Sequence, residues 1–233
     1  MKRIITALLL VLMLATAAVG FAAETGIDKA TKAFEAGNKE LAFTEINKVI
    51  KDDPKSVDAY FVRANMYMSV EKTQEALADL SKVVELAPNV IVGYMDRSTL
   101  YALLKDYEKA IADANKAVDI APSLPMPYVN RANINMSFAK FQDAIADCNK
   151  AIELFPNNAD LYFIRATANT AAGKLENAIA DFSKSIEIDA QQADAYYSRA
   201  VVYSRMGNKE LAEADMAKAK SLNPNITDIN KQQ

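Results

Sequence analysis

The chain has 233 residues, of which 51% are hydrophobic and 24% are charged, and this is the composition of a folding protein. Its formal net charge is -3 and no run of basic residues occurs, which argues against nucleic acid as the main ligand. Six glycines and seven prolines are few breakers for this length, so long helices are favoured over many short strands.

Two residue counts restrict the chemistry. The absence of histidine excludes Ser/His and Cys/His nucleophile pairs and His-ligated metal sites. The single cysteine, Cys148, excludes an internal disulfide and a cysteine-rich zinc site. We expect Cys148 to be a buried thiol, because equivalent positions of the repeat described below carry Ile46, Leu80, Phe182 and Met216. A disulfide to another chain is the alternative.

The first segment is typical of a secretory signal peptide. Two basic residues precede an almost wholly apolar stretch from Ile4 to Val19, and Gly20 and Ala22 suit the small-residue positions of a cleavage site. We expect cleavage after Ala22, so that residues 1–22 direct export to the periplasm or the medium of a bacterium. An uncleaved membrane anchor is the alternative, although the apolar stretch is short for a span that needs ~20 residues.

The rest of the chain is repetitive, with a constant period of ~34 residues. Six kinds of residue return in register, and the repeat units predicted from them cover residues 23–56, 57–90, 91–124, 125–158, 159–192 and 193–224, before a polar tail at 225–233. The columns are Ala42, Ala76, Ala110, Ala144, Ala178 and Ala212; Lys48, Lys82, Lys116, Lys150, Lys184 and Lys218; Tyr60, Tyr94, Tyr128, Tyr162 and Tyr196; Arg63, Arg97, Arg131, Arg165 and Arg199; Asp79, Asp113, Asp147, Asp181 and Asp215; Pro54, Pro88, Pro122, Pro156 and Pro224.

Each unit has the pattern of two helices. In the second unit Tyr60, Arg63, Ala64 and Tyr67 follow the i, i+3, i+4, i+7 spacing of one helix face, and the residues from Ala76 mark a second helix. Glycine stands in the turn of the first, fifth and sixth units, where a helix C-terminus favours it. Proline closes nearly every unit, because it cannot continue a helix.

The repeat resembles the tetratricopeptide repeat (TPR) over residues 23–224. The period, the large residues Tyr60 and Tyr67, the small residue Ala64, the Ala76 column and the closing proline all match. The resemblance implies an all-α, right-handed α-solenoid superhelix of six helix-turn-helix units. The first unit is a degenerate cap, and Asn135 and Asn169 replace the tyrosine of the Tyr67 column.

The charged columns have a structural and a surface interpretation. Each Asp follows an Arg at one constant offset, and the resemblance places this Arg column where the two helices of a unit face each other. We expect a ladder of partly buried Arg–Asp pairs, because a guanidinium binds a carboxylate at two points. The alternative is an exposed pair between Asp79 and Lys82. In either case residues that recur in every unit indicate a scaffold rather than a unique catalytic site.

Residues that vary between units are the better candidates for binding. The resemblance implies that the first helices line a concave groove, and its geometry assigns to that groove an apolar and aromatic surface with amides and hydroxyls, suited to a peptide segment. The predicted groove residues are Phe61, Asn65, Met68, Met95, Thr99, Val129, Asn133, Met136, Phe163, Thr167, Tyr197 and Val201. Some of them could instead be buried between units. Acidic residues at the groove edge, such as Asp58, mildly favour a basic ligand.

We therefore expect an exported, non-enzymatic scaffold that binds a protein or peptide segment in its groove, without a cofactor, metal, nucleic acid or membrane span after signal cleavage. A self-associating structural protein that stacks through its terminal repeats is the alternative. It would be favoured if the last helix lacked a polar outer face, and after Ala212, Met216 and Ala219 only a short tail follows.

Overall fold

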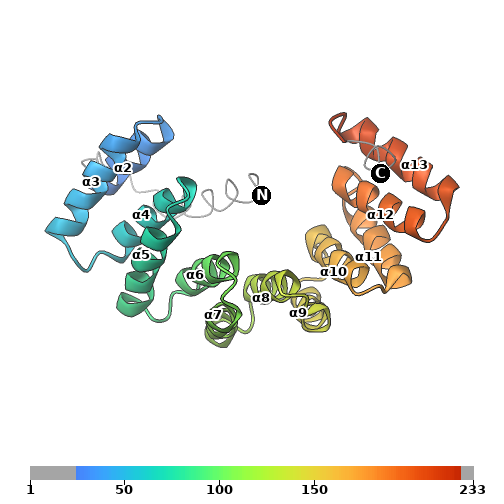
Figure 1. Ribbon diagram of the computed structural model, residues 1–233, viewed down its shortest axis with the longest axis horizontal. Coiled ribbons are helices and arrows are strands. Elements are labelled where there is room, and N and C mark those ends of the chain that lie inside the picture. Colours follow the sequence, from blue (N-terminus) through green and yellow to red (C-terminus); the bar gives the residue numbers. More distant parts are fainter. Residues whose placement is uncertain (1–24, 227–233) are drawn as a thin grey trace. The chain divides into compact units, whose positions relative to one another are not determined.

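The computed structural model describes residues 25–226. The predicted signal peptide, residues 1–22, and residues 227–233 of the predicted tail lie outside the described residues. Within the described range the regular structure is entirely helical, twelve helices joined in pairs by short turns (Figure 1). Among the described helices, none combines the length and the apolar character that a membrane crossing requires.

The helices alternate as first and second members of six hairpins. The first helices are α2 (Gly26–Glu35), α4 (Val57–Ser69), α6 (Ile91–Leu103), α8 (Pro125–Ser137), α10 (Ala159–Ala171) and α12 (Ala193–Arg205). The second helices are α3 (Lys39–Asp52), α5 (Thr73–Leu86), α7 (Tyr107–Ile120), α9 (Phe141–Leu154), α11 (Leu175–Ile188) and α13 (Lys209–Leu222). The predicted fold class, an all-α solenoid of helix-turn-helix repeats, is confirmed. The chain divides into two compact units, one up to Pro54 and one from Lys55.

The first compact unit, up to Pro54, contains the hairpin of α2 and α3. Helix α2 begins with a capping box, in which the Thr25 hydroxyl accepts a hydrogen bond from the Asp28 backbone N–H and the Asp28 carboxylate accepts one from the Thr25 backbone N–H. Phe34 and Phe43 hold the two helices together by an edge-to-face contact with ring centroids 6.3 Å apart. This hairpin therefore has an aromatic contact of its own.

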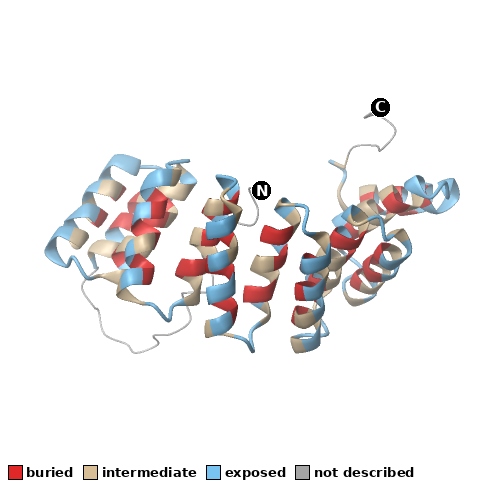
Figure 2. Cartoon of the chain, turned by 60° about the horizontal axis from the view of Figure 1, so that its bottom comes forward, coloured by how far each residue is buried: buried red, intermediate tan, exposed pale blue. Residues whose placement is uncertain are grey.

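The second compact unit, from Lys55 onward, stacks its five hairpins in sequence order. Small residues allow the helices to approach closely, and Ala64 and Ala76 have no exposed surface. Together with Leu77, Leu80 and Leu100 they form one apolar cluster that joins α4 and α5 to α6 of the next hairpin. Figure 2 shows buried residues on the helix sides that face one another and exposed residues on the outer sides. A single hairpin buries little by itself, so its stability comes from its neighbours.

Every hairpin turn requires one residue in the left-handed backbone region. Gly37, Gly173 and Gly207 supply it with φ between 75° and 80°. The same position in the other three hairpins is taken by Glu71, Lys105 and Ala139, with φ between 57° and 63°. Only glycine adopts this conformation without steric cost, so three of the six turns are strained.

The prolines act at helix boundaries. Pro88 and Pro122 directly follow the C-cap residues of α5 and α7. Pro125 is the first residue of α8, where its missing N–H has no intrahelical partner to lose, and Pro127 is buried two residues later. Both prolines therefore lie in the first turn of α8.

Candidate functional site

The five Arg–Asp pairs predicted from the constant offset are all formed, one in each hairpin of the second compact unit. In each pair the guanidinium of the first helix donates from two nitrogens to both carboxylate oxygens of the second helix, at 2.6 to 3.1 Å. The pairs are Arg63–Asp79, Arg97–Asp113, Arg131–Asp147, Arg165–Asp181 and Arg199–Asp215. The aspartates are buried, and hydrogen bonds to them raise the pKa of all five arginines above its usual value.

The arginines also connect neighbouring hairpins. In four of them the remaining terminal nitrogen donates to a side chain on the second helix of the preceding hairpin. These links are Arg97–Ser81, Arg131–Asn115, Arg165–Asn149 and Arg199–Ser183, at 2.8 to 3.2 Å. These partners recur at the period of the repeat but were not predicted from the sequence, because two of the four are serine and two are asparagine. The repeating charges thus tie hairpins together as well as helices within a hairpin.

The exposed alternative for the charges is not what the structure forms. Lys82 pairs with Glu85 at 2.7 Å, while Asp79 pairs with Arg63. Lys150 and Lys184 likewise pair with the glutamate at position i+3. These i, i+3 pairs lie on the solvated surface and contribute only a few tenths of a kcal/mol each, about 0.2–0.5.

The predicted groove residues occupy the opposite side of the first helices from the arginines. Thr99, Asn133 and Thr167 are exposed, whereas the other nine are half-buried. Several of the half-buried ones also pack on the core. Phe61 and Met68 contact the cluster around Leu80, and the Phe163 ring lies 5.5 Å from that of Phe182. The surface of the predicted groove residues is therefore partly exposed and partly packed between helices.

Polar contacts between neighbouring first helices fix this surface. Asn130 of α8 donates to the Met95 carbonyl oxygen of α6 and to the Thr99 hydroxyl, both at 3.3 Å. The Ser98 hydroxyl donates in turn to Oδ1 of Asn130 at 3.0 Å. At the groove edge the Gln192 amide donates to the exposed Asp160 at 2.8 Å. These bonds join α6 to α8 and α10 to the start of α12, the helices that carry most of the predicted groove residues.

Asp96 is half-buried, with its Oδ2 atom shielded from solvent, at the position that Asn130 holds one repeat later. Oδ2 of Asp96 has no hydrogen-bond partner among the described residues. Burial raises the pKa of Asp96 to about 6. No sequence pattern indicated this, because the equivalent positions carry residues as different as Val62 and Ile164.

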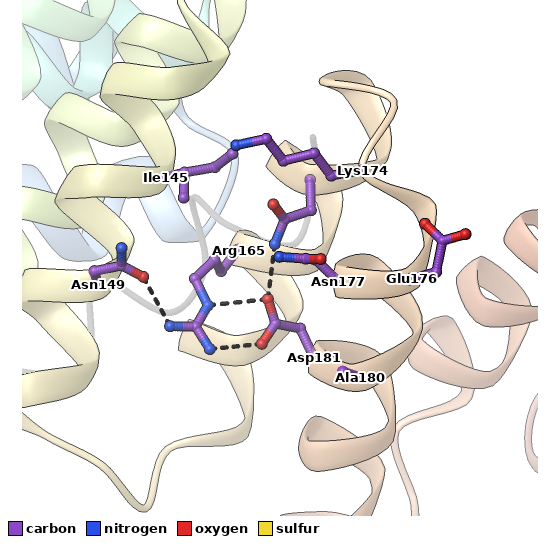
Figure 3. A pocket seen from close by; sticks show the side chains of 9 residues that line it. Ile145, Asn149, Arg165, Lys174, Glu176, Asn177, Ala180 and Asp181 are labelled. Atoms are coloured by element: carbon purple, nitrogen blue, oxygen red, sulfur yellow. Dashed lines mark hydrogen bonds and ion pairs between the residues drawn. The ribbon is translucent and has the colours of Figure 1, made fainter.

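The two departures from the tyrosine column are hydrogen-bonded to the ladder. Nδ2 of Asn135 donates to Asp147 at 3.3 Å and Nδ2 of Asn169 donates to Asp181 at 2.9 Å. Asn169 lies at a pocket between α9, α10 and α11 (Figure 3). Arg165 is held there between Asn149 and Asp181, as the dashed lines show. Both substitutions are visible in the sequence, but their hydrogen bonds to the aspartates are not.

The lone thiol of Cys148 is buried on α9, with 1% of its surface exposed. Burial raises the pKa of this thiol to about 12, so it is protonated at neutral pH. Among the described residues, no group of three or more acidic, histidine or cysteine side chains is placed to bind a metal ion.

Comparison with known families agrees with the repeat. A family model described as tetratricopeptide repeat matches residues 57–90, 93–124, 127–158 and 193–226. A second model, described as TPR repeat, matches residues 166–207. No curated protein matches the chain by sequence.

Solved structures share the fold. PilW, a type IV pilus biogenesis factor, is 19% identical with a TM-score of 0.76 over 88% of this chain and 96% of its own. A tetratricopeptide repeat protein from Parabacteroides merdae ATCC 43184 is 22% identical, with a TM-score of 0.69 over 86% of this chain and 78% of its own. YrrB, a TPR protein with an unusual peptide-binding site, is 24% identical, with a TM-score of 0.57 over 77% of this chain and 93% of its own.

Proposed function

Because the chain belongs to the tetratricopeptide repeat family, whose fold suggests a protein–protein interaction scaffold, we propose that it binds a protein or peptide segment along its first helices. The observation that carries the proposal is the contrast between two sides of these helices. One side repeats the same arginine in five hairpins and pairs it with aspartate. The other side changes from hairpin to hairpin and keeps apolar and amide side chains partly accessible.

The chemistry of the variable side favours an extended or helical segment with apolar side chains. Met68, Met95 and Met136 are half-buried and adapt their shape to a ligand. Asn133 and Thr167 are exposed and offer hydrogen-bonding groups beside them. The exposed Asp58, Asp160 and Asp194 surround this surface with negative charge, so a segment that also carries basic residues fits best.

We propose further that the protein acts outside the cytoplasm, in a bacterial envelope or the medium. This rests on the charged, apolar and small-residue sequence of residues 1–22. Mass spectrometry of the protein from its native cells, combined with fractionation, tests it. A mature chain that starts at Ala23 in the exported fraction is expected, and an unprocessed chain in the cytoplasm would contradict the proposal.

Self-stacking through the last repeat is less well supported. The second helices of inner hairpins place apolar residues against the next hairpin; Leu77 packs with Leu100, and Ile179 packs with Val202. The equivalent residue of α13 is the exposed Glu213. A charged residue at this place is what a capping repeat needs, so we favour a terminal cap over a stacking surface.

The binding surface is tested by adding bulk without removing core contacts. Asn133→Arg combined with Thr167→Arg places two long cationic side chains on the exposed part of the surface. Cross-linking in the native envelope fraction should then lose the partners that the unchanged protein captures. The matched control is Ala78→Arg with Ala112→Arg, because both alanines are exposed on second helices. Equal capture by both double variants and the unchanged protein would reject the assignment.

A further inference from the structure

The fifth hairpin contains a pocket of about 520 Å³ that the binding surface above does not include. Side chains of α9, α10 and α11 line it, among them Asn149, Arg165, Asn169 and Asn177 (Figure 3). Arg165 and Asn169 each follow a groove residue of α10 by two positions. Two residues are about 200° around a helix of 3.6 residues per turn, so the pocket opens on a different side of α10 from the proposed groove.

The equivalent space is filled by a tyrosine ring in the second and third hairpins. In the second, the Tyr67 ring centroid lies 5.8 Å from Cζ of Arg63 and 5.9 Å from Nζ of Lys72. Their counterparts three repeats later are Arg165 and Lys174, and both line the pocket. Asn169 is the counterpart of Tyr67 itself. The pocket is therefore the space that a tyrosine side chain occupies elsewhere in this chain.

The third hairpin shows the same arrangement. The Tyr101 ring lies 5.9 Å from Cζ of Arg97 and 5.4 Å from Nζ of Lys109. The counterparts of Arg97 and Lys109 two repeats later are Arg165 and Asn177, which again line the pocket. Two independent hairpins thus indicate the same occupant for this space.

The fourth hairpin shows that this tyrosine can come from outside the hairpin. Asn135 replaces the tyrosine there, and Tyr107 of the preceding hairpin takes the space. Its hydroxyl donates to Oδ1 of Asn135 at 3.1 Å, and its ring lies 5.9 Å from Nζ of Lys140, the counterpart of Lys72. The counterpart of Tyr107 that precedes the fifth hairpin is Phe141 of α9, which lacks a hydroxyl and is not among the residues lining the pocket.

Asn169 lines the pocket and presents a hydrogen-bond acceptor there. Its side chain is buried, with 3% of the residue exposed, and Nδ2 is fixed by donation to Asp181 at 2.9 Å. A carboxylate only accepts hydrogen bonds, so this contact directs the amide nitrogen to Asp181 and leaves Oδ1 as the remaining acceptor. Among the described residues no donor reaches Oδ1 of Asn169.

We propose that this pocket binds a tyrosine side chain of a partner protein, with its ring over the Arg165 guanidinium and its hydroxyl donating to Oδ1 of Asn169. The Tyr162 ring centroid lies 5.5 Å from Cζ of Arg165, whereas two tyrosine rings, those of Tyr94 and Tyr101, lie 5.9 Å from Cζ of Arg97. A partner ring supplies the second such contact. None of the ten tyrosines of this chain is fully exposed, and the partner that we propose is a different protein.

Titration of the purified protein with N-acetyl-tyrosinamide, followed by backbone amide NMR, tests the pocket. We expect saturable shifts confined to the amides around Asn149, Arg165 and Asn177. N-acetyl-phenylalaninamide lacks the hydroxyl and should bind roughly threefold to tenfold more weakly, the worth of one hydrogen bond. N-acetyl-leucinamide should produce no saturable shift there. Absence of local shifts with the tyrosine probe, or equal shifts with all three, would overturn the proposal.

Two variants separate the pocket from other causes. Asn169→Tyr fills the space with the residue that the second and third hairpins use, so it should fold and abolish binding of both aromatic probes. Asn169→Ala keeps the space but removes the acceptor, so the tyrosine probe should fall to the affinity of the phenylalanine probe. A thermal melt of Asn169→Tyr at or above that of the unchanged protein verifies folding. Undiminished binding by Asn169→Tyr, or a retained preference for tyrosine in Asn169→Ala, would refute the assignment.

Discussion

The third hairpin, α6 and α7, and the fifth, α10 and α11, carry the same arginine–aspartate pair but differ around it. Where the third has Tyr101 beside its arginine, the fifth has Asn169 and a pocket. Three of the positions that differ between the two hairpins are compared below. They are Tyr101 against Asn169, Asp96 against Ile164 and Lys105 against Gly173. The paired charges fix how the helices meet, and the neighbouring positions are free to fill the space, strain it or leave it open. New binding sites therefore arise at the positions next to the paired charges.

The strongest test of the shared part is removal of the arginine. Arg97→Met and Arg165→Met should each lower the free energy of unfolding by about 3 kcal/mol, because each leaves a buried aspartate without its counter-ion. Breaking a fully buried pair can cost more, and the partial exposure of both arginines, 17% and 23% of the side chain, keeps the expected loss moderate. Chemical denaturation measures it.

Lys184→Met is the matched control for the arginine variants. Lys184 pairs with Glu187 on the surface, and its removal should leave the denaturation midpoint nearly unchanged. Equal midpoints for Arg165→Met and Lys184→Met would show that the pairs contribute no more than surface charges do.

Exchanging the tyrosine and the asparagine should move stability in opposite directions. Tyr101→Asn removes a ring from the apolar clusters on both sides of α6, and a loss of about 2–3 kcal/mol is expected. Asn169→Tyr should be neutral or gain up to about 1 kcal/mol, since it fills an open space. The double variant measured by thermal unfolding should show near-additive effects, and a destabilised Asn169→Tyr would mean that the two hairpins pack differently around the arginine.

Asp96 should make the third hairpin sensitive to pH in a way that the fifth is not. Its folded-state pKa of about 6 lies above the ordinary value of 3.8, so the folded protein binds the proton more tightly than the unfolded chain. Stability from this group is therefore full below pH 4 and is lost as the pH rises through 6, by on the order of 2 kcal/mol.

Asp96→Asn should be more stable than the unchanged protein at pH 7 and lack this loss. Asparagine keeps the shape and requires no buried charge, and Asn130 already occupies the same position one repeat later with its hydrogen bonds made. Asp119→Asn, at an exposed site of α7, is the control. Parallel stability curves against pH for the unchanged protein and Asp96→Asn would disprove the burial effect.

The turns should give the smallest difference. Lys105 holds φ of 63° and Gly173 holds φ of 75° at the same position. Lys105→Gly should stabilise the protein by up to about 1 kcal/mol, and Gly173→Lys should destabilise it by a similar amount, because only glycine adopts this backbone without strain. Melting temperatures that move in the same direction in both variants would contradict a shared turn geometry.

Much of this comparison was accessible from the sequence, because the constant period aligns each position with its counterparts in the other units. The Ala76 column, the closing Pro88 and the Arg63–Asp79 spacing predicted the helix pairs and the pairing of charges. The assignment of groove residues stays a prediction.

What the sequence did not predict depends on side-chain direction across hairpins. Nothing local distinguishes Tyr107, which fills the next hairpin, from its counterpart Phe141. Ser81 and Asn149 are ordinary polar residues until an arginine from the following hairpin reaches them. The left-handed turn was visible only where glycine marked it, and Ala139 adopts the same conformation because the packed helices on both sides impose it.

The four links from an arginine to the preceding hairpin, made by Arg97, Arg131, Arg165 and Arg199, all point the same way along the chain. Arg199 donates to Ser183, and Arg165 donates to Asn149, each in the preceding hairpin. Among the described residues, neither arginine donates to a hairpin that follows it. A growing polypeptide emerges from its N-terminal end, so the acceptor of each of these four arginines is synthesised before the arginine that binds it. The array is therefore suited to assembly one hairpin at a time during synthesis, and shortening it from the C-terminus leaves the remaining arginines fully bonded.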